Sequence, residues 1–293
     1  MSWLLSLGAL GVTLLGGFVA LDRLAVASLT PRHRAPTRHP RDMAGAEAHE
    51  DVAFPSAGIE LRGWLLSPPV DGSERAAVAV VHGWGADSGD MLQVAEPLVR
   101  AGHPVLVFDV RHHGRSPGAS FLTARQFRDD VLAATRFLAR RYPGRARVLV
   151  GHSLGGAAAV LAALEGAPVH AVAHVAAPAD ILEVLEIRFR RGRLPAALVV
   201  RLLAPFWERR AGVPFEELQP FLRAPELRLP LLVVGAKRDR YVPTTHVERM
   251  AVAPRAELRV IDAGHFDLLG HPEFAEALAD FVARVEEEVA TRR

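Results

Sequence analysis

Short apolar runs alternate with amphipathic stretches along most of the chain. The runs are four to eight residues long and rich in valine, leucine and alanine, which is typical of strands buried in a parallel sheet. They span residues 76–82, 103–110, 147–150, 170–177, 229–235 and 257–261. The stretches between most of them have a helical period. Strands that alternate with helices predict a mostly parallel, doubly wound sheet of the α/β class.

Two departures from this alternation complete the predicted architecture. Residues 51–55 and 59–67 read as strands joined at Ala57-Gly58, which predicts an antiparallel hairpin and brings the sheet to eight strands. Residues 181–228 are largely helix-like, rich in arginine, and separate the sixth strand from the seventh. An insertion of this kind predicts a helical cap, whose arginines we expect to form mainly a solvated face.

The first residues predict a membrane anchor. Residues 2–21 carry no charged side chain, and such a helix is about 30 Å long, the thickness of a bilayer core. A cleavable signal peptide is the alternative, with Ala25-Val26-Ala27 as the cleavage site. The amino-terminal region has no basic side chain, and Asp22-Arg23 precedes that site, which favours an uncleaved anchor over residues 1–29.

The positive charges that follow the apolar run predict the orientation of the protein. They are Arg23, Arg32, Arg34, Arg38 and Arg41. Because basic residues stay on the cytoplasmic side, we expect a single-pass membrane protein with its globular part in the cytoplasm. Residues 30–50 are rich in proline, arginine and histidine without an apolar period, so they predict a solvated linker to a domain at residues 51–293.

Composition excludes several classes of function. The 35 basic and 33 acidic residues leave a net charge of +2, which gives no nucleic-acid footprint. The chain contains no cysteine, so disulfides, thiolate catalysis and cysteine-ligated zinc are excluded. His170 and His174 are four apart, but they lie in a predicted strand, where core histidines are more common than metal ligands. We therefore predict no metal and no cofactor.

A candidate nucleophile lies between a strand and a helix. Gly151-His152-Ser153-Leu154-Gly155 follows the run 147–150 and precedes an alanine-rich segment. In that context the pattern G-x-S-x-G places the serine at a sharp turn at the carboxyl end of a strand. Serine needs a base that is oriented by a third group. The amide of Leu154 opens the helix and is a candidate oxyanion donor.

Candidates for the base and the acid follow other strands, at the same edge of the sheet. His265 comes after the run 257–261, and Asp239 comes after the run 229–235. Asp180 follows the preceding strand and is an alternative acid, or else the N-cap of the next helix. In the loop that follows the run 76–82, the amide of Trp84 is the second candidate oxyanion donor.

These motifs resemble those of the α/β-hydrolase superfamily, over residues 51–289. The matching segments are HGWG (82–85), FDVRHHGRS (108–116), GHSLGG (151–156), GAKRDRYVP (235–243) and AGHF (263–266). The chain is similar to the capped, monoacylglycerol-lipase-like and S33-type esterases. The resemblance implies the α/β-hydrolase fold, Ser153 as nucleophile, Asp239 as acid, His265 as base, and the amides of Trp84 and Leu154 as oxyanion donors. His112 departs from the family turn R-G-H-G, which has glycine there.

We therefore expect a membrane-anchored serine hydrolase that acts on a small acyl ester by acyl transfer, with substrate choice set by the cap. Three alternatives stay open. An S33-like peptidase and a thioesterase would use the same triad on other leaving groups. A non-catalytic scaffold that binds a ligand under the cap belongs to a different class of function.

Overall fold

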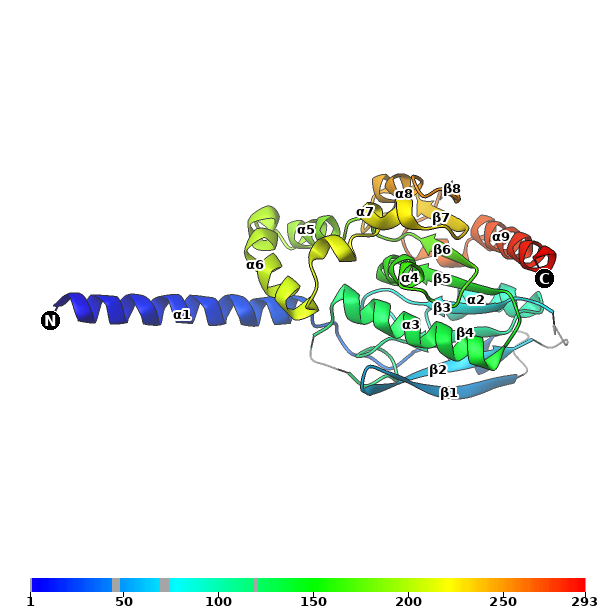
Figure 1. The fold of residues 1–293 in the computed structure, drawn as a ribbon, viewed down its shortest axis with the longest axis horizontal. Coiled ribbons are helices and arrows are strands. Elements are labelled where there is room, and N and C mark those ends of the chain that lie inside the picture. Colours follow the sequence, from blue (N-terminus) through cyan, green and yellow to red (C-terminus); the bar gives the residue numbers. More distant parts are fainter. Residues whose placement is uncertain (1, 44–47, 69–73, 119–120, 293) are drawn as a thin grey trace.

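The computed structural model describes residues 2–43, 48–68, 74–118 and 121–292, and for residues 2–12 it describes the backbone alone. One sheet runs through the molecule in the order β1-β2-β4-β3-β5-β6-β7-β8 (Figure 1). Its strands are β1 (Ala48–Ser56), β2 (Ile59–Ser67), β3 (Ala77–Val81), β4 (Val105–Asp109), β5 (Arg147–His152), β6 (Ala171–Val175), β7 (Leu231–Ala236) and β8 (Ala256–Ile261).

The pairing of the strands confirms the predicted fold class. β2 is antiparallel to both β1 and β4, and every other neighbouring pair is parallel. β1 and β2 form the predicted hairpin, which turns at Ala57 and Gly58, both with positive φ. The sheet is the mostly parallel, doubly wound, eight-stranded sheet of the α/β-hydrolase fold.

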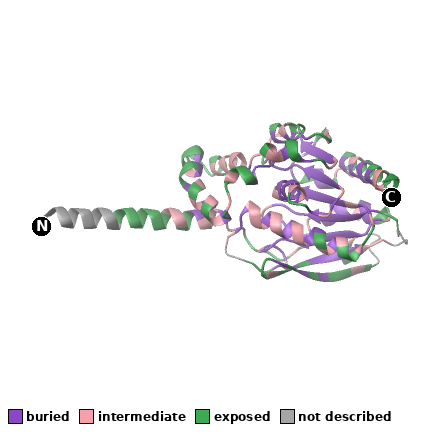
Figure 2. Ribbon diagram, in the orientation of Figure 1, coloured by how far each residue is buried: buried purple, intermediate pink, exposed green. Residues whose placement is uncertain are grey.

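Helices cover both faces of the sheet, and this explains why its central strands are apolar at every position. Helices α3 (Ala124–Arg141), α4 (Leu154–Leu164) and α8 (Thr244–Met250) pack on one face, and α2 (Leu92–Arg100) and α9 (Pro272–Thr291) pack on the other. Alternate residues of β3 face the two layers, and all five are buried. Figure 2 shows the buried residues concentrated in these strands.

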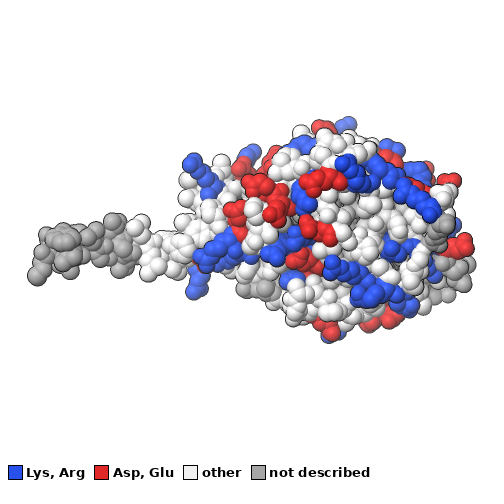
Figure 3. Space-filling view, viewed as in Figure 1, with Lys and Arg blue, Asp and Glu red and all other residues white. Residues whose placement is uncertain are grey.

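The cap lies between β6 and β7, where an insertion was predicted. It consists of α5 (Ile181–Arg191), α6 (Ala196–Ala211), η2 (Phe215–Leu218), α7 (Pro220–Arg223) and η3 (Ala224–Glu226). Helices α5 and α6 pack against each other, and α6 buries Trp207 against the end of helix α1 (Ser2–Ser28). Figure 3 shows acidic and basic side chains interspersed over one face of the molecule, in keeping with the small net charge.

Helix α1 corrects the prediction of a membrane anchor. It extends away from the globular part, and its carboxyl-terminal part packs against the cap (Figure 1). Within the described residues no helix is long and apolar enough to cross a membrane. The predicted single-pass anchor, membrane location and cytoplasmic orientation are therefore wrong, and the membrane is not supported as a partner. Much of the predicted span, residues 2–12, has side chains outside the described residues.

The carboxyl end of α1 shows the physical reason for this correction. Asp22 and Arg23 lie in the described half of the helix, and Asp22 forms an ion pair of 2.6 Å with Arg210 of α6. Ala25 is fully buried in the same contact. The end of α1 is therefore a packing element of the cap, which the apolar length of the segment did not indicate.

The segment predicted as a solvated linker lies against the domain in its described part. We call residues 29–43 the N-terminal strap. Leu29, Pro31 and Pro40 are buried, and the carbonyl oxygen of Leu29 accepts a hydrogen bond of 2.8 Å from the amide of Leu122. Arg34 pairs with Asp90 and Asp87 at 2.5 Å and 3.2 Å. The strap thereby carries the chain from α1 past the cap to β1, which begins before the predicted domain boundary at residue 51.

Candidate active site

Ser153 occupies a strained turn between β5 and α4. Its φ and ψ are 53° and −129°, a conformation that side-chain-bearing residues rarely adopt. The turn is fixed on both sides, because the Ser153 amide donates to the carbonyl oxygen of Val175 at 2.9 Å and its own carbonyl oxygen accepts from Gly156 at 2.8 Å. The surrounding structure thus holds a conformation that the isolated chain would avoid.

Two glycines allow the loop after β3 to approach this turn. A Cβ on Gly83 would lie 2.7 Å from the Cβ of Ser153, and a Cβ on Gly155 would overlap the carbonyl oxygen of His82. Real Cβ atoms essentially never come so close, so larger residues would push the two loops apart. The close approach brings Trp84 beside Ser153, and both residues line the same cavity.

Asp239 and His265 form a buried, hydrogen-bonded pair. His265 Nδ1 lies 2.6 Å from Asp239 Oδ2, and the two side chains are 5% and 0% exposed. A carboxylate only accepts hydrogen bonds, so Nδ1 carries the proton and Nε2 is left as an acceptor. The second oxygen of Asp239 accepts from the amides of Tyr241 and Val242, at 2.7 Å and 2.9 Å. A histidine with its proton on Nδ1 and a free Nε2 is the tautomer that a general base requires.

Two further histidines support the loops of the site. His152 Nε2 donates to the carbonyl oxygen of His265 at 3.0 Å, which ties the candidate base to the turn of Ser153. Burial, followed by the nearby His265, lowers the pKa of His152 to about 3. His82 accepts from the Val110 amide at 3.1 Å, and burial lowers its pKa to about 4. Both rings are therefore neutral at physiological pH and act as structural supports.

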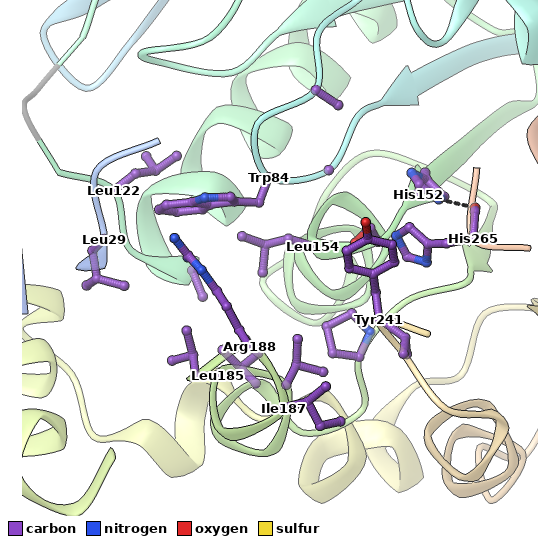
Figure 4. A pocket seen from close by; sticks show the side chains of 18 of the residues that line it. Leu29, Trp84, Leu122, His152, Leu154, Leu185, Ile187, Arg188, Tyr241 and His265 are labelled. Atoms are coloured by element: carbon purple, nitrogen blue, oxygen red, sulfur yellow. Dashed lines mark hydrogen bonds between the residues drawn. The ribbon is translucent and has the colours of Figure 1, made fainter. Parts of the chain in front are cut away.

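Four of the candidate residues line one cavity of ≈ 330 Å³, to which α5 also contributes (Figure 4). Ser153, His265, Trp84 and Leu154 all line it. Among the described residues, neither the Trp84 amide nor the Leu154 amide has a backbone acceptor, so both stay candidate oxyanion donors. No hydrogen bond joins Ser153 Oγ to His265 within the described part of the chain. Catalytic hydrogen bonds of this kind often tighten only when substrate binds.

Of the two candidate acids, Asp239 is the one that contacts His265. Asp180 is the N-cap of α5, where its Oδ1 accepts from the Glu183 amide at 3.1 Å. Its other oxygen lies 3.6 Å from Arg249. Asp180 therefore has a helix-capping role and an ion-pair partner, as the alternative reading of the sequence expected.

Part of the cavity wall was missed in the sequence. It includes Leu29 of the strap, Arg188 and Arg191 of α5, and Tyr241 and Phe266 of the two loops that carry the acid and the base. We expected the cap arginines to be mainly solvated. The sequence did contain a signal for the two arginines. Ile181, Val184 and Leu185 line the cavity, and Arg188 and Arg191 follow them at helical spacing, which predicts that they lie on the same face of α5.

The remaining polar candidates have structural surroundings. Within the described residues, no group of three or more His, Asp or Glu is arranged to hold a metal ion. Asp109 accepts from the amides of Ser88 and Arg115, at 2.7 Å and 3.0 Å, and so holds the turn after β4. In that turn His112 has a φ of 59°, the left-handed conformation that glycine adopts readily. His112 thus keeps the backbone shape for which glycine would be the usual residue.

His174 of β6 is fully buried, and both of its ring nitrogens lack a hydrogen-bond partner in the described structure. Burial lowers its pKa from 6.5 to about 4. As the pH falls, His174 is therefore protonated in the unfolded chain before it is protonated in the folded protein. The free energy of unfolding consequently falls as the pH decreases from 6.5 to about 4. We expect His174→Leu to flatten the fall of the unfolding free energy over this range, measured by urea denaturation. An unchanged slope would contradict a neutral buried His174.

Comparisons with known proteins point to one superfamily. The family model described as "Serine aminopeptidase, S33" matches residues 72–213. Human monoglyceride lipase is 32% identical over 139 residues, which are 46% of this chain and 44% of that protein. A probable serine hydrolase of Drosophila melanogaster is 28% identical over 133 residues, 45% of this chain and 38% of that protein. The chain thus matches less than half the length of these two relatives.

Solved structures agree with the fold. An esterase from Pyrococcus furiosus superposes with a TM-score of 0.70 at 24% identity, covering 87% of this chain and 97% of that one. A third relative found by sequence, the uncharacterized protein YqkD of Bacillus subtilis, is 26% identical over 219 residues, 70% of this chain and 68% of that protein. Family model, relatives and fold thus agree that the chain has the α/β-hydrolase fold and is similar to S33-type serine hydrolases.

Proposed function

We propose that this hydrolase cleaves carboxylic esters of small molecules by acyl transfer to Ser153. The observation that carries the proposal is the buried hydrogen bond of 2.6 Å between Asp239 and His265, in a cavity that the strained Ser153 also lines. A nucleophile and a base that line one cavity, with a buried acid that orients the base, serve no purpose in a protein that only binds a ligand. The set therefore favours an enzyme over a scaffold.

The proposed reaction has two halves. Ser153 Oγ attacks the ester carbonyl carbon while His265 Nε2 takes its proton, and the amides of Trp84 and Leu154 stabilise the oxyanion. Asp239 stabilises the imidazolium, which then gives its proton to the leaving alcohol. A water molecule attacks the acyl-enzyme with His265 again as base, and the carboxylic acid is released.

The lining of the cavity supports an ester over an aminopeptide substrate. An aminopeptidase must bind the positively charged amino terminus of a peptide, for which a carboxylate is the natural partner. Among the described residues that line the cavity there is no Asp or Glu, and two arginines are present. These arginines would repel an ammonium group. Human monoglyceride lipase and the Pyrococcus furiosus esterase agree by name with this preference, whereas the matching family model is described as a serine aminopeptidase.

The proposal is tested by labelling with a fluorophosphonate probe and by hydrolysis of p-nitrophenyl esters. We expect the folded protein to be labelled at Ser153 and to hydrolyse the esters, and Ser153→Ala to remove both signals. Aminoacyl p-nitroanilides serve as the peptide reference and should be poor substrates. A folded protein that neither labels nor turns over any ester would identify the scaffold alternative as correct. Preferential turnover of the anilides would favour the peptidase.

A further inference from the structure

One face of α5 brings positive charge to the substrate cavity. Ile181, Leu185 and Arg188 lie on this face, and Arg191 follows one turn later. All four line the cavity, and their spacing of three or four residues places them on a single stripe of the helix. The first part of the stripe is apolar and its end is cationic. A substrate in this cavity therefore meets the guanidinium groups directly.

Arg188 points into the cavity, toward Trp84 (Figure 4). Its guanidinium carbon lies 5.7 Å from the centre of the Trp84 ring, and Nη1 donates to the carbonyl oxygen of Ser28 at 3.3 Å. Part of the side chain is open to solvent, as a ligand-binding group must be. The surrounding protein atoms still displace enough water to lower the pKa of the guanidinium.

Arg191 lines the same cavity and lies beside Tyr241. Its guanidinium carbon is 4.4 Å from the centre of the Tyr241 ring, and that ring is 5.0 Å from the ring of His265. One arginine thus stacks beside the candidate oxyanion loop and the other beside the candidate base. The two cations flank the place where an ester would react.

The acidic side chains of α5 are used elsewhere. Glu186 pairs with Arg190 at 3.9 Å, and Glu183 pairs with Arg249 at 2.8 Å. Among the described residues neither Arg188 nor Arg191 has a carboxylate within ion-pair distance, and none lines the cavity. Two arginines without a carboxylate, in a cavity that is otherwise mostly apolar, leave a positive potential that the protein itself does not neutralise.

We propose that the substrate ester carries an anionic group, a carboxylate or a phosphate, which Arg188 binds while Arg191 adds to the positive potential. This inference rests on the proposed ester hydrolysis. The planar guanidinium matches both anions in geometry, and the attraction is stronger next to apolar walls than in water. A neutral ester would fill the apolar part of the cavity and leave both charges without a partner.

Two esters that differ only at their far end test this inference. Mono-p-nitrophenyl suberate ends in a carboxylate, and p-nitrophenyl methyl suberate ends in a neutral ester of similar length. We expect kcat/KM to be about tenfold higher for the acid, mainly through KM, and to lose this advantage at high salt. In Arg188→Met the ratio of the two kcat/KM values should fall to about one. Arg188→Lys should keep part of the preference, since it keeps the charge.

Arg190→Met is the matched control, because Arg190 lies on the same helix, is exposed and pairs with Glu186. In Arg190→Met the ratio of kcat/KM for the acid to kcat/KM for the neutral ester should equal that of the unchanged protein. Competition by octyl phosphate and by octanoate, with octanol as the neutral reference, separates the two anions. The anion that inhibits more strongly, and whose inhibition is weaker in Arg188→Met, identifies the anionic group that the site prefers.

The possible outcomes separate this inference from the proposed function. If neither ester is hydrolysed, the proposed function fails. If both are hydrolysed with a ratio near one, or if Arg188→Met lowers both rates equally and leaves the ratio intact, the anionic substrate is wrong. In that case Arg188 serves only to tie α5 to α1 through the carbonyl oxygen of Ser28.

Discussion

Ser153→Ala is expected to lower kcat/KM for ester hydrolysis by about 10⁶-fold, the size of effect that loss of the nucleophile has in serine proteases. The variant keeps His265, Asp239 and the oxyanion donors, but no atom remains to form the acyl-enzyme. The rate that remains should be that of direct attack by water on the ester bound in the cavity. The measurement is the initial rate on a p-nitrophenyl ester, with the melting temperature as the control for folding.

The strained backbone at Ser153 allows a second variant to separate catalysis from stability. Ser153→Gly removes the nucleophile as Ser153→Ala does, so it should be equally inactive. Glycine accepts the φ of 53° readily. Relief of this strain exceeds the extra entropy that glycine loses on folding, so the glycine variant should be more stable than the alanine variant by about 1 kcal/mol. Equal unfolding free energies in urea would show that the turn stores no strain.

Asp239→Asn is expected to lower kcat by about 10⁴-fold, with little change in the fold. The asparagine amide can donate to His265 Nδ1, which would place the proton on Nε2, the atom that must accept it from Ser153. The positive imidazolium would also lose its partner. The rate is measured on p-nitrophenyl esters at saturating concentration, so that kcat is isolated from substrate binding.

Asp180→Asn is the matched control for this change, because it removes the same charge from the other candidate acid. Asparagine remains a good N-cap, so α5 keeps its first turn and only the contact with Arg249 at 3.6 Å is weakened. Turnover should stay close to that of the unchanged protein. A loss of kcat in Asp180→Asn with retained activity in Asp239→Asn would reverse the assignment of the acid.

The sheet could be predicted because its central strands leave no choice of residue. β3 is covered on both faces, so all its positions must be apolar, and the run is visible without any knowledge of its neighbours. The helix that begins at Ala124 could be predicted for a local reason, since Thr123 and Gln126 form a capping box. Signals of this kind lie within a few residues of the structure that they determine.

The role of the first helix could not be predicted in this way. Asp22 finds its partner Arg210 in the cap, far along the chain. The prediction used only the length and hydropathy of residues 2–21, and neither quantity reports such a contact. The same holds for the wall of the cavity, where Leu29, Arg188 and Tyr241 come from three separate segments. Ser153, Asp239 and His265 could be placed at one edge because each follows its own parallel strand.

Because the end of α1 packs on the cap, we expect the residues before position 30 to influence which substrates the cavity accepts. Trp207 Nε1 donates to the carbonyl oxygen of Ala25 at 3.2 Å and lies 3.0 Å from Ser28 Oγ, so a cap side chain contacts a backbone carbonyl and a hydroxyl at the end of α1. One turn later, Leu29 forms part of the cavity wall. Differences in sequence or length that arise in this segment during evolution would reshape the cavity, although the segment precedes the first strand of the sheet.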